Sequence, residues 1–102
     1  MNTVHQSSLA ARLDLNLLRV FDAIAQQRNL ARAAAHLHLS PSAVSHALAR
    51  LRTQLDDPLF ERHGRGVTPS ALARRLAPEV RDALSRLEAA LNRAHPFEQG
   101  VI

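Results

Sequence analysis

The chain of 102 residues contains no cysteine, tryptophan, tyrosine or lysine, and these absences narrow its class. Without cysteine there is neither a disulfide framework nor the ligand set of a zinc finger, which suits the reducing cytosol. No apolar run approaches the roughly 20 residues of a membrane span. Residues 1–12 also lack the apolar block of a secretory signal. We therefore expect a cytoplasmic protein with no membrane partner.

Positive charge in this chain is carried by arginine alone. Thirteen basic residues stand against nine acidic ones, which gives a net charge of +4. Arginine forms bidentate contacts with phosphate and guanine, so this composition favours a nucleic-acid partner. A GC-rich genome explains a lysine-free chain rich in alanine and arginine equally well. The length predicts one small domain and, at most, one appendage.

Residues 30–52 form the most informative segment, because they predict a helix-turn-helix. A short helix, a turn at 38–40 and a longer helix follow one another, and each helix has an apolar inner stripe. Ser40 is expected to cap the second helix, and Pro41 fits its first position. Helices joined by so short a turn cross steeply, which exposes the start of the second helix to a DNA major groove. The inner stripes are Ala33, Ala34 and Leu37, then Val44, Leu48, Leu51 and Leu55.

A further helix is predicted before this segment. Either Asp14 or Asn16 caps it, it ends near Gln27, and Asn29 caps the helix that follows. Its apolar face is expected to consist of Leu15, Leu18, Phe21, Ile24 and Ala25.

After the helix-turn-helix the spacing of the apolar residues no longer fits a helix, and the segment predicts a β-hairpin, or wing. Asp56-Asp57-Pro58 ends the preceding helix, because a residue before proline is steered away from the helical region. Residues 59–62 and 67–68 form two short strands around a turn at 63–66, whose two glycines supply positive φ angles. Such a hairpin is marginal alone, so Leu59 and Phe60 should anchor it in the helical core.

Residues 70–94 predict a long helix, with Thr68 as its cap and Pro69 in its first turn. An apolar stripe follows it at alternating spacings of four and three, which is the seam of a coiled coil and predicts a homodimer. The alternative is an amphipathic helix that packs on its own domain, and a second stripe of Leu72, Leu76 and Ala83 can face that core. Pro78 should bend the helix. The seam consists of Ala73, Ala77, Val80, Leu84, Leu87 and Leu91.

In this order, these features resemble the N-terminal DNA-binding region of the LysR-type transcriptional regulators. The resemblance covers residues 14 to about 94. It implies a mainly α fold, a winged helix-turn-helix of three helices and a β-hairpin wing, followed by a long dimerising linker helix. It also implies a bacterial regulator that binds double-stranded DNA sequence-specifically and is not an enzyme. The segments that carry it include Asp14–Leu18, Arg32–Ala34, Leu37–Ser40, Ala43–Leu48, Asp57–Phe60 and Thr68-Pro69.

The resemblance also implies the division of the chain and its partners. No cofactor is expected in these residues, whereas an effector-binding domain that takes a small molecule is expected to follow them in a longer regulator. The expected DNA partner is a two-fold symmetric operator, which a homodimer binds, and the protein is expected to be associated with the nucleoid. Tetramers are an option for the full-length protein. The parts are a flexible arm at 1–13, the DNA-binding domain at 14–69 with its helix-turn-helix at about 30–52, the linker and dimerisation helix at 70–94, and a hinge tail at 95–102.

The helix at 41–55 is expected to enter the major groove. Its outward side chains carry hydroxyl, imidazole and guanidinium groups, which bond base edges; an ordinary solvated face is the alternative. The preceding helix and the wing supply contacts to phosphates or to the adjacent minor groove. Arg52 can instead pair with Asp56, four residues on. Base contacts are assigned to Ser42, Ser45, His46 and Arg50. Backbone and wing contacts are assigned to Arg32, Ser40, Pro41, Arg52, Arg62 and Arg65.

The sequence departs from the pattern of the family in the dipeptide that begins the second helix of the helix-turn-helix and at Ala31. Pro41-Ser42 stand where the family commonly has Gln-Pro, so the amide that would reach a base edge is missing. Ala31 stands where a hydroxyl residue is common, which removes a phosphate contact or a cap. His38 is expected in the left-handed turn position that is usually given to glycine.

Other classes of function have weaker support. His36 and His38 do not share a helix face, so no metal site is predicted. The chain shows no nucleophile–base pair, no paired carboxylates on one helix face and no phosphate loop. The competing class is an assembly module that uses the helix-turn-helix only as a scaffold. A scaffold does not need the serines, histidine and arginine of residues 42–52, among which there is no acidic residue.

Overall fold

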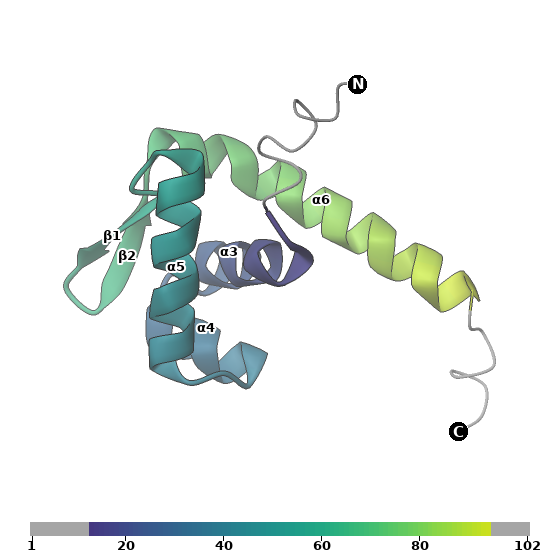
Figure 1. The fold of residues 1–102 in the computed structure, drawn as a ribbon, viewed down its shortest axis with the longest axis horizontal. Helices are drawn as coiled ribbons and strands as arrows, with labels where there is room; N and C mark the ends of the chain where they lie inside the picture. The colour runs from purple at the N-terminus through teal and green to yellow at the C-terminus, as the bar shows by residue number, and fades with distance from the viewer. Residues whose placement is uncertain (1–12, 95–102) are drawn as a thin grey trace.

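The computed structural model describes residues 13–94, which form a mainly helical domain with one two-stranded hairpin. Of the four helices among these residues, three make up the body, and the long last one crosses it and extends beyond it (Figure 1). Apart from Leu13, the predicted arm lies outside the described residues, as does the whole predicted hinge tail. The elements are α3 (Leu15–Gln27), α4 (Leu30–Leu37), α5 (Pro41–Leu55), β1 (Phe60–His63), β2 (Gly66–Pro69) and α6 (Ala71–Ala94).

Side-chain caps fix the starts of the first three helices. Asp14 accepts a hydrogen bond from the backbone N–H of Leu17 at 2.8 Å, so it is Asp14 and not Asn16 that caps α3. Asn29 caps α4, and Ser40 caps α5 through the N–H of Ala43 at 3.1 Å. These groups offer the acceptors that the first turn of a helix lacks. The predicted caps of α4 and α5 are therefore confirmed.

The turn of the helix-turn-helix is built on His38. Its φ of 60° and ψ of 39° are left-handed, and its N–H donates to the carbonyls of Ala34 and Ala35, which ends α4. Glycine is the usual residue in this left-handed region, and histidine adopts it more readily than most other residues do. The predicted left-handed position is confirmed.

The core lies where α3, α4 and α5 meet the base of the hairpin. The inner stripes predicted for α4 and α5 face it, with Leu37 and Leu55 only partly buried. Phe21 and Phe60 lie at its centre, with ring centroids 5.3 Å apart and planes tilted by 50°. Such tilted pairs are favourable because the edge of one ring meets the face of the other.

The apolar face predicted for α3 is wrong in part. Leu15 is 47% exposed, whereas Leu17 and Val20 are buried beside Phe21 and Ile24. Residues spaced by three advance by about 300° around a helix, so a series of such steps drifts by about 60° each time. After three steps Leu15 and Ile24 lie on opposite sides, and only the later members of the predicted set reach the core.

The wing pairs β1 with β2 in antiparallel register, from Phe60 opposite Pro69 to His63 opposite Gly66. Leu59 and Phe60 are fully buried, which confirms that they anchor the hairpin. Leu59 has a φ of 63°. A leucine in this region costs roughly 1–2 kcal/mol, and burial of its side chain offsets that cost.

The two glycines of the wing serve different purposes. Gly64 has a φ of 64° and supplies the predicted left-handed residue. Gly66 does not have a positive φ, so the prediction for it is wrong. A Cβ at Gly66 would lie 2.9 Å from the carbonyl oxygen of Arg28, while the N–H of Val67 donates to that oxygen at 3.0 Å. Gly66 thus allows the wing to approach the end of α3.

The cap of α6 is Ser70 and not the predicted Thr68. Ser70 Oγ accepts from the N–H of Ala73 at 3.1 Å and donates to Asp57 Oδ2 at 2.6 Å. Thr68 and Pro69 belong to β2, because the hairpin ladder continues to the pair of Phe60 and Pro69. Pro78 lies inside α6 without dividing it.

The predicted seam of α6 divides into two parts. Ala73 is fully buried in the chain's own core, Leu84 is nearly so, and Ala77 and Val80 are half-buried against that core. The assignment of Ala73 to a dimer interface is therefore wrong, because it has no surface to offer. Leu72 and Leu76 pack partly against the core as the second stripe predicts, whereas Ala83 is exposed. Leu87 and Leu91 remain exposed.

Within residues 13–94, no helix has the length and apolar character that crossing a membrane requires.

Candidate nucleic-acid interface

The outward face of α5 has the composition that the sequence predicts. Ser42, Ser45, His46 and Arg50 are all exposed, whereas the inner stripe of the same helix is buried at Val44, Leu48 and Leu51. No acidic residue occurs in α5. The face therefore presents hydroxyl, imidazole and guanidinium groups together, and no carboxylate of the same helix opposes a DNA backbone.

The start of α5 is exposed and carries two neighbouring hydroxyls. Ser40 Oγ, which caps the helix, lies 3.3 Å from Ser42 Oγ in a hydrogen bond. Pro41 occupies the first helical position, where its missing N–H leaves no unpaired donor. The positive end of the helix dipole therefore lies at the surface, where it attracts an anion. The hydroxyl of Ser42 is partly engaged by the cap, whereas Ser45 and His46 lie one turn further along.

The wing is held against the start of α4. Asn29 uses both ends of its amide: Oδ1 accepts from the N–H of Arg32, and Nδ2 donates to the carbonyl of Arg65 at 2.9 Å. A single residue thus caps α4 and fixes the tip of the wing. This arrangement brings Arg62 and Arg65 of the wing to the positive end of α4, the helix that is expected to supply phosphate contacts.

Beside this hydrogen bond, a groove of about 390 Å³ lies between the wing and the start of α4. Arg62 and Arg65 supply its positive charge, and Ala31 lies where the family commonly places a hydroxyl. Two guanidinium groups beside a helix N-terminus form a suitable site for a phosphate. The residues that line the groove are Asn29, Leu30, Ala31, Arg62, Gly64, Arg65, Gly66 and Val67.

Arg52 has a different environment from the one that the sequence predicts. Its Nε donates to the carbonyl of Pro58 at 2.8 Å, and one Nη donates to the carbonyl of Phe60. These bonds connect the end of α5 to the first strand of the wing. Neither Asp56 nor a DNA phosphate is needed to explain the position of this side chain, so we assign Arg52 a structural role.

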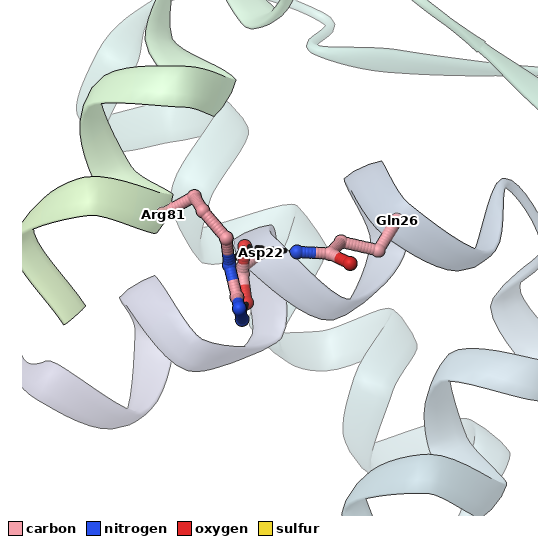
Figure 2. Close-up of polar contacts among 3 residues, drawn as sticks. All are labelled: Asp22, Gln26 and Arg81. Atoms are coloured by element: carbon pink, nitrogen blue, oxygen red, sulfur yellow. Dashed lines mark hydrogen bonds and ion pairs between the residues drawn. The ribbon is translucent and has the colours of Figure 1, made fainter. Parts of the chain in front are cut away.

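The sequence did not predict the contact between α3 and α6 in Figure 2. Arg81 forms an ion pair with Asp22, Nη2 to Oδ2, at 2.8 Å. Asp22 and Arg81 are 59 positions apart, so no local pattern joins them. The available signal was an acidic residue among the apolar residues of α3, because a buried carboxylate requires a partner.

His36 and His38 are exposed on and after the last turn of α4. Among residues 13–94, no three His, Asp or Glu side chains are grouped so that they could hold a metal ion.

Comparison with known sequences shows the family. Residues 15–74, more than half of the chain, match the family described as bacterial regulatory helix-turn-helix protein, lysR family. The chain belongs to the LysR family. Its relatives include the HTH-type transcriptional regulator LeuO of Escherichia coli, which is 50% identical over 76 residues, 74% of this chain and 24% of LeuO. Nodulation protein D 2 of Rhizobium tropici is 48% identical over 85 residues, 83% of this chain and 27% of that protein.

Solved structures of transcriptional regulators share the fold. A probable transcriptional regulator, PA0477 of Pseudomonas aeruginosa, has a TM-score of 0.82 and 49% identity, over 85% of this chain and 29% of that chain. The CbnR_DBD–DNA complex has a TM-score of 0.73 and 26% identity, over 84% of this chain and 99% of that chain. The predicted family and the winged helix-turn-helix fold are thereby confirmed. Since the family comprises transcriptional regulators, this segment is a DNA-binding domain and not an enzyme.

This LysR chain spans about a quarter of the length of the curated relatives it matches. What those longer proteins do as a whole is therefore a matter for proposal.

Proposed function

We propose that the chain binds double-stranded DNA sequence-specifically, with α5 in the major groove. The observation that carries this proposal is the exposed, acid-free face of α5. Serine and histidine bond base edges, and arginine forms a fork onto guanine O6 and N7. Base contacts fall to Ser42, Ser45, His46 and Arg50.

Contacts to the DNA backbone come from the elements on either side of α5. Arg32 on α4, together with Ser40 and Pro41 at the start of α5, faces phosphates. Arg62 and Arg65 bind phosphates or enter the adjacent minor groove, and the hold of Asn29 on the wing supports this placement. Phosphate contacts fix register and orientation, whereas base contacts supply the specificity.

The assembly that we propose is a homodimer on a two-fold symmetric operator. The part of α6 beyond Leu84 is exposed throughout, and it carries the last two leucines of the heptad pattern. A dimer axis through this region would repeat the symmetry of the protein in its DNA site. In the longer regulator we propose an effector-binding domain that takes a small molecule and tetramers in addition to dimers, acting on nucleoid DNA in the cytoplasm.

The salt dependence of binding tests the proposed phosphate contacts. Each contact contributes about 0.9 to the slope of log affinity against log salt concentration. A dimer of the Arg62→Ala variant loses two contacts, so we expect a slope shallower by about 1.8 and weaker binding to all sequences alike. Fluorescence anisotropy with labelled duplexes at several salt concentrations measures the slope.

Arg86→Ala is the matched control for this experiment. Arg86 lies on α6, its side chain is largely exposed, and its removal changes the net charge equally. It should leave the slope unchanged. Equal slopes for wild type and Arg62→Ala would remove Arg62 from the interface, and a slope near zero for wild type would contradict the proposed DNA binding.

A further inference from the structure

The contact between Arg81 and Asp22 is a directional fork and not a simple charge pair. Arg81 Nη2 donates to Asp22 Oδ2 at 2.8 Å, and Arg81 Nε donates to Oδ1 at 3.2 Å. Gln26 Nε2 also donates to Oδ1 at 3.2 Å, so both carboxylate oxygens are occupied (Figure 2). Planar, bidentate pairs of this kind restrain orientation as well as distance.

The fork lies where α6 leaves the body of the domain. Leu84, one turn beyond Arg81, is the last buried residue of α6, and every residue from 85 to 94 is exposed. Figure 1 shows this part of α6 extending away from α3, α4 and α5. The side chain of Asp22 is only 12% exposed and that of Arg81 is 53% exposed, so the pair closes the edge of the α3–α6 contact.

The apolar contacts of α6 with the body come from a stripe of residues on both sides of the fork: Leu72, Ala73, Leu76, Ala77 and Val80 before it, and Leu84 one turn after it. These contacts hold α6 against the body, but apolar contact is non-directional, so it defines the angle of the helix less sharply than a bidentate pair does. The fork is specific in direction and lies near the end of the contact, where it has the greatest control over the angle of the exposed segment.

We infer that Arg81 and Asp22 are positioning residues that set the separation of half-sites which the dimer accepts. The inference rests on the proposed dimer and its binding to DNA. The ten residues beyond Leu84 extend about 15 Å, so a tilt of about 10° moves their far end by about 3 Å. That displacement is close to the roughly 3.4 Å rise of one base pair. The angle that the fork holds therefore determines the spacing between the two copies of α5.

The test is a selection from DNA in which two inverted half-sites are separated by a variable number of base pairs. Wild type should enrich one separation. Arg81→Lys keeps the charge but loses the fork, so the preference for that separation over its neighbours should fall by up to about fivefold, the range of a partly exposed ion pair. Base preference within each half-site and the salt slope should stay unchanged, which a general loss of stability would not produce.

The chain provides a matched control in a second ion pair on the same helix. Asp82 and Arg86 are 3.7 Å apart and both largely exposed, so Asp82→Asn should select the wild-type separation. If Arg81→Lys also kept the wild-type distribution, the inference would be overturned while the proposed function stood. If wild type enriched no paired half-sites, the proposed function would fail and the inference with it.

A distance measurement checks the same inference without DNA. The chain has no native cysteine, so Thr53→Cys on the exposed side of α5 introduces one spin-label site per subunit. Pulsed electron paramagnetic resonance of the dimer should give a narrow distance distribution, which broadens when Arg81→Lys is added. Identical distributions would overturn the inference, and far-UV circular dichroism confirms that each variant is folded.

Discussion

Replacing Leu87 and Leu91 together with aspartate is expected to give a monomer whose affinity for a paired operator is about 10²–10⁴-fold lower. That is the advantage of binding two linked sites at once. Leu87 is 38% exposed and Leu91 is 54% exposed, so the core of the chain does not need them. Across a two-fold axis each aspartate would meet another introduced aspartate or the apolar surface of the partner helix, which places like charges and unpaired carboxylates in the interface.

Sedimentation velocity measures the change of state, and anisotropy on one-site and two-site duplexes measures the affinities. Ser85→Asp serves as the control, because Ser85 is exposed and outside the stripe. It should leave both the dimer and its affinity intact. The double variant should still bind a single half-site as wild type does. A dimer that survives the double substitution would remove this part of α6 from the interface.

Phe60→Ala is expected to lower the free energy of unfolding by about 3–5 kcal/mol, the usual cost of removing a buried aromatic side chain. Phe60 is fully buried at the base of the wing and lies against Phe21. A domain of this size has a total stability of about 5–15 kcal/mol, so the variant should be largely unfolded at modest denaturant concentrations. Far-UV circular dichroism during urea unfolding is suitable, because the chain has neither tryptophan nor tyrosine for fluorescence.

Leu15→Ala is the control for this experiment, since Leu15 is exposed and was placed on the inner face of α3 by sequence alone. Its effect should be within about 0.5 kcal/mol of zero. A large loss for Leu15→Ala, or a small one for Phe60→Ala, would contradict the packing described above.

Features that depend on neighbouring residues were predicted well from the sequence. Asn29 and Ser40 cap helices because each side chain reaches an N–H three residues away, and His38 ends α4 within one turn. The inner stripe of α5 follows from the helical period. For the same reason the outward residues of α5, such as Ser45 and His46, could be named before their exposure was known.

Features that depend on distant residues were predicted poorly. The cap of α6 was assigned to Thr68 because nothing local shows that β2 continues to Pro69; that depends on pairing with Phe60. The sequence predicts a DNA phosphate or Asp56 as the partner of Arg52, whereas its guanidinium donates to the carbonyls of Pro58 and Phe60, which the fold of the wing brings near. The fork between Asp22 and Arg81 joins helices far apart in the chain.

The apolar stripe of α6 shows the same limit in another form. Its period correctly identifies one continuous face of the helix. The period does not say what covers that face, and the structure shows that Ala73 and Leu84 face the chain's own core, while Leu87 and Leu91 do not. The heptad pattern therefore predicts which face of α6 is apolar, but it does not distinguish packing against the chain's own core from packing against the helix of a second subunit.

The most direct test of sequence reading by α5 is the selection of DNA from a random pool by wild type and by His46→Ala. Wild type should enrich paired, inverted half-sites. His46→Ala should lose a preference worth roughly 1–3 kcal/mol at one base pair per half-site, with its salt slope unchanged, whereas Ser42→Ala should change little. If wild type enriched no sequence, or if His46→Ala kept every base preference that Ser42→Ala lost, the assignment of base reading to this face of α5 would be contradicted.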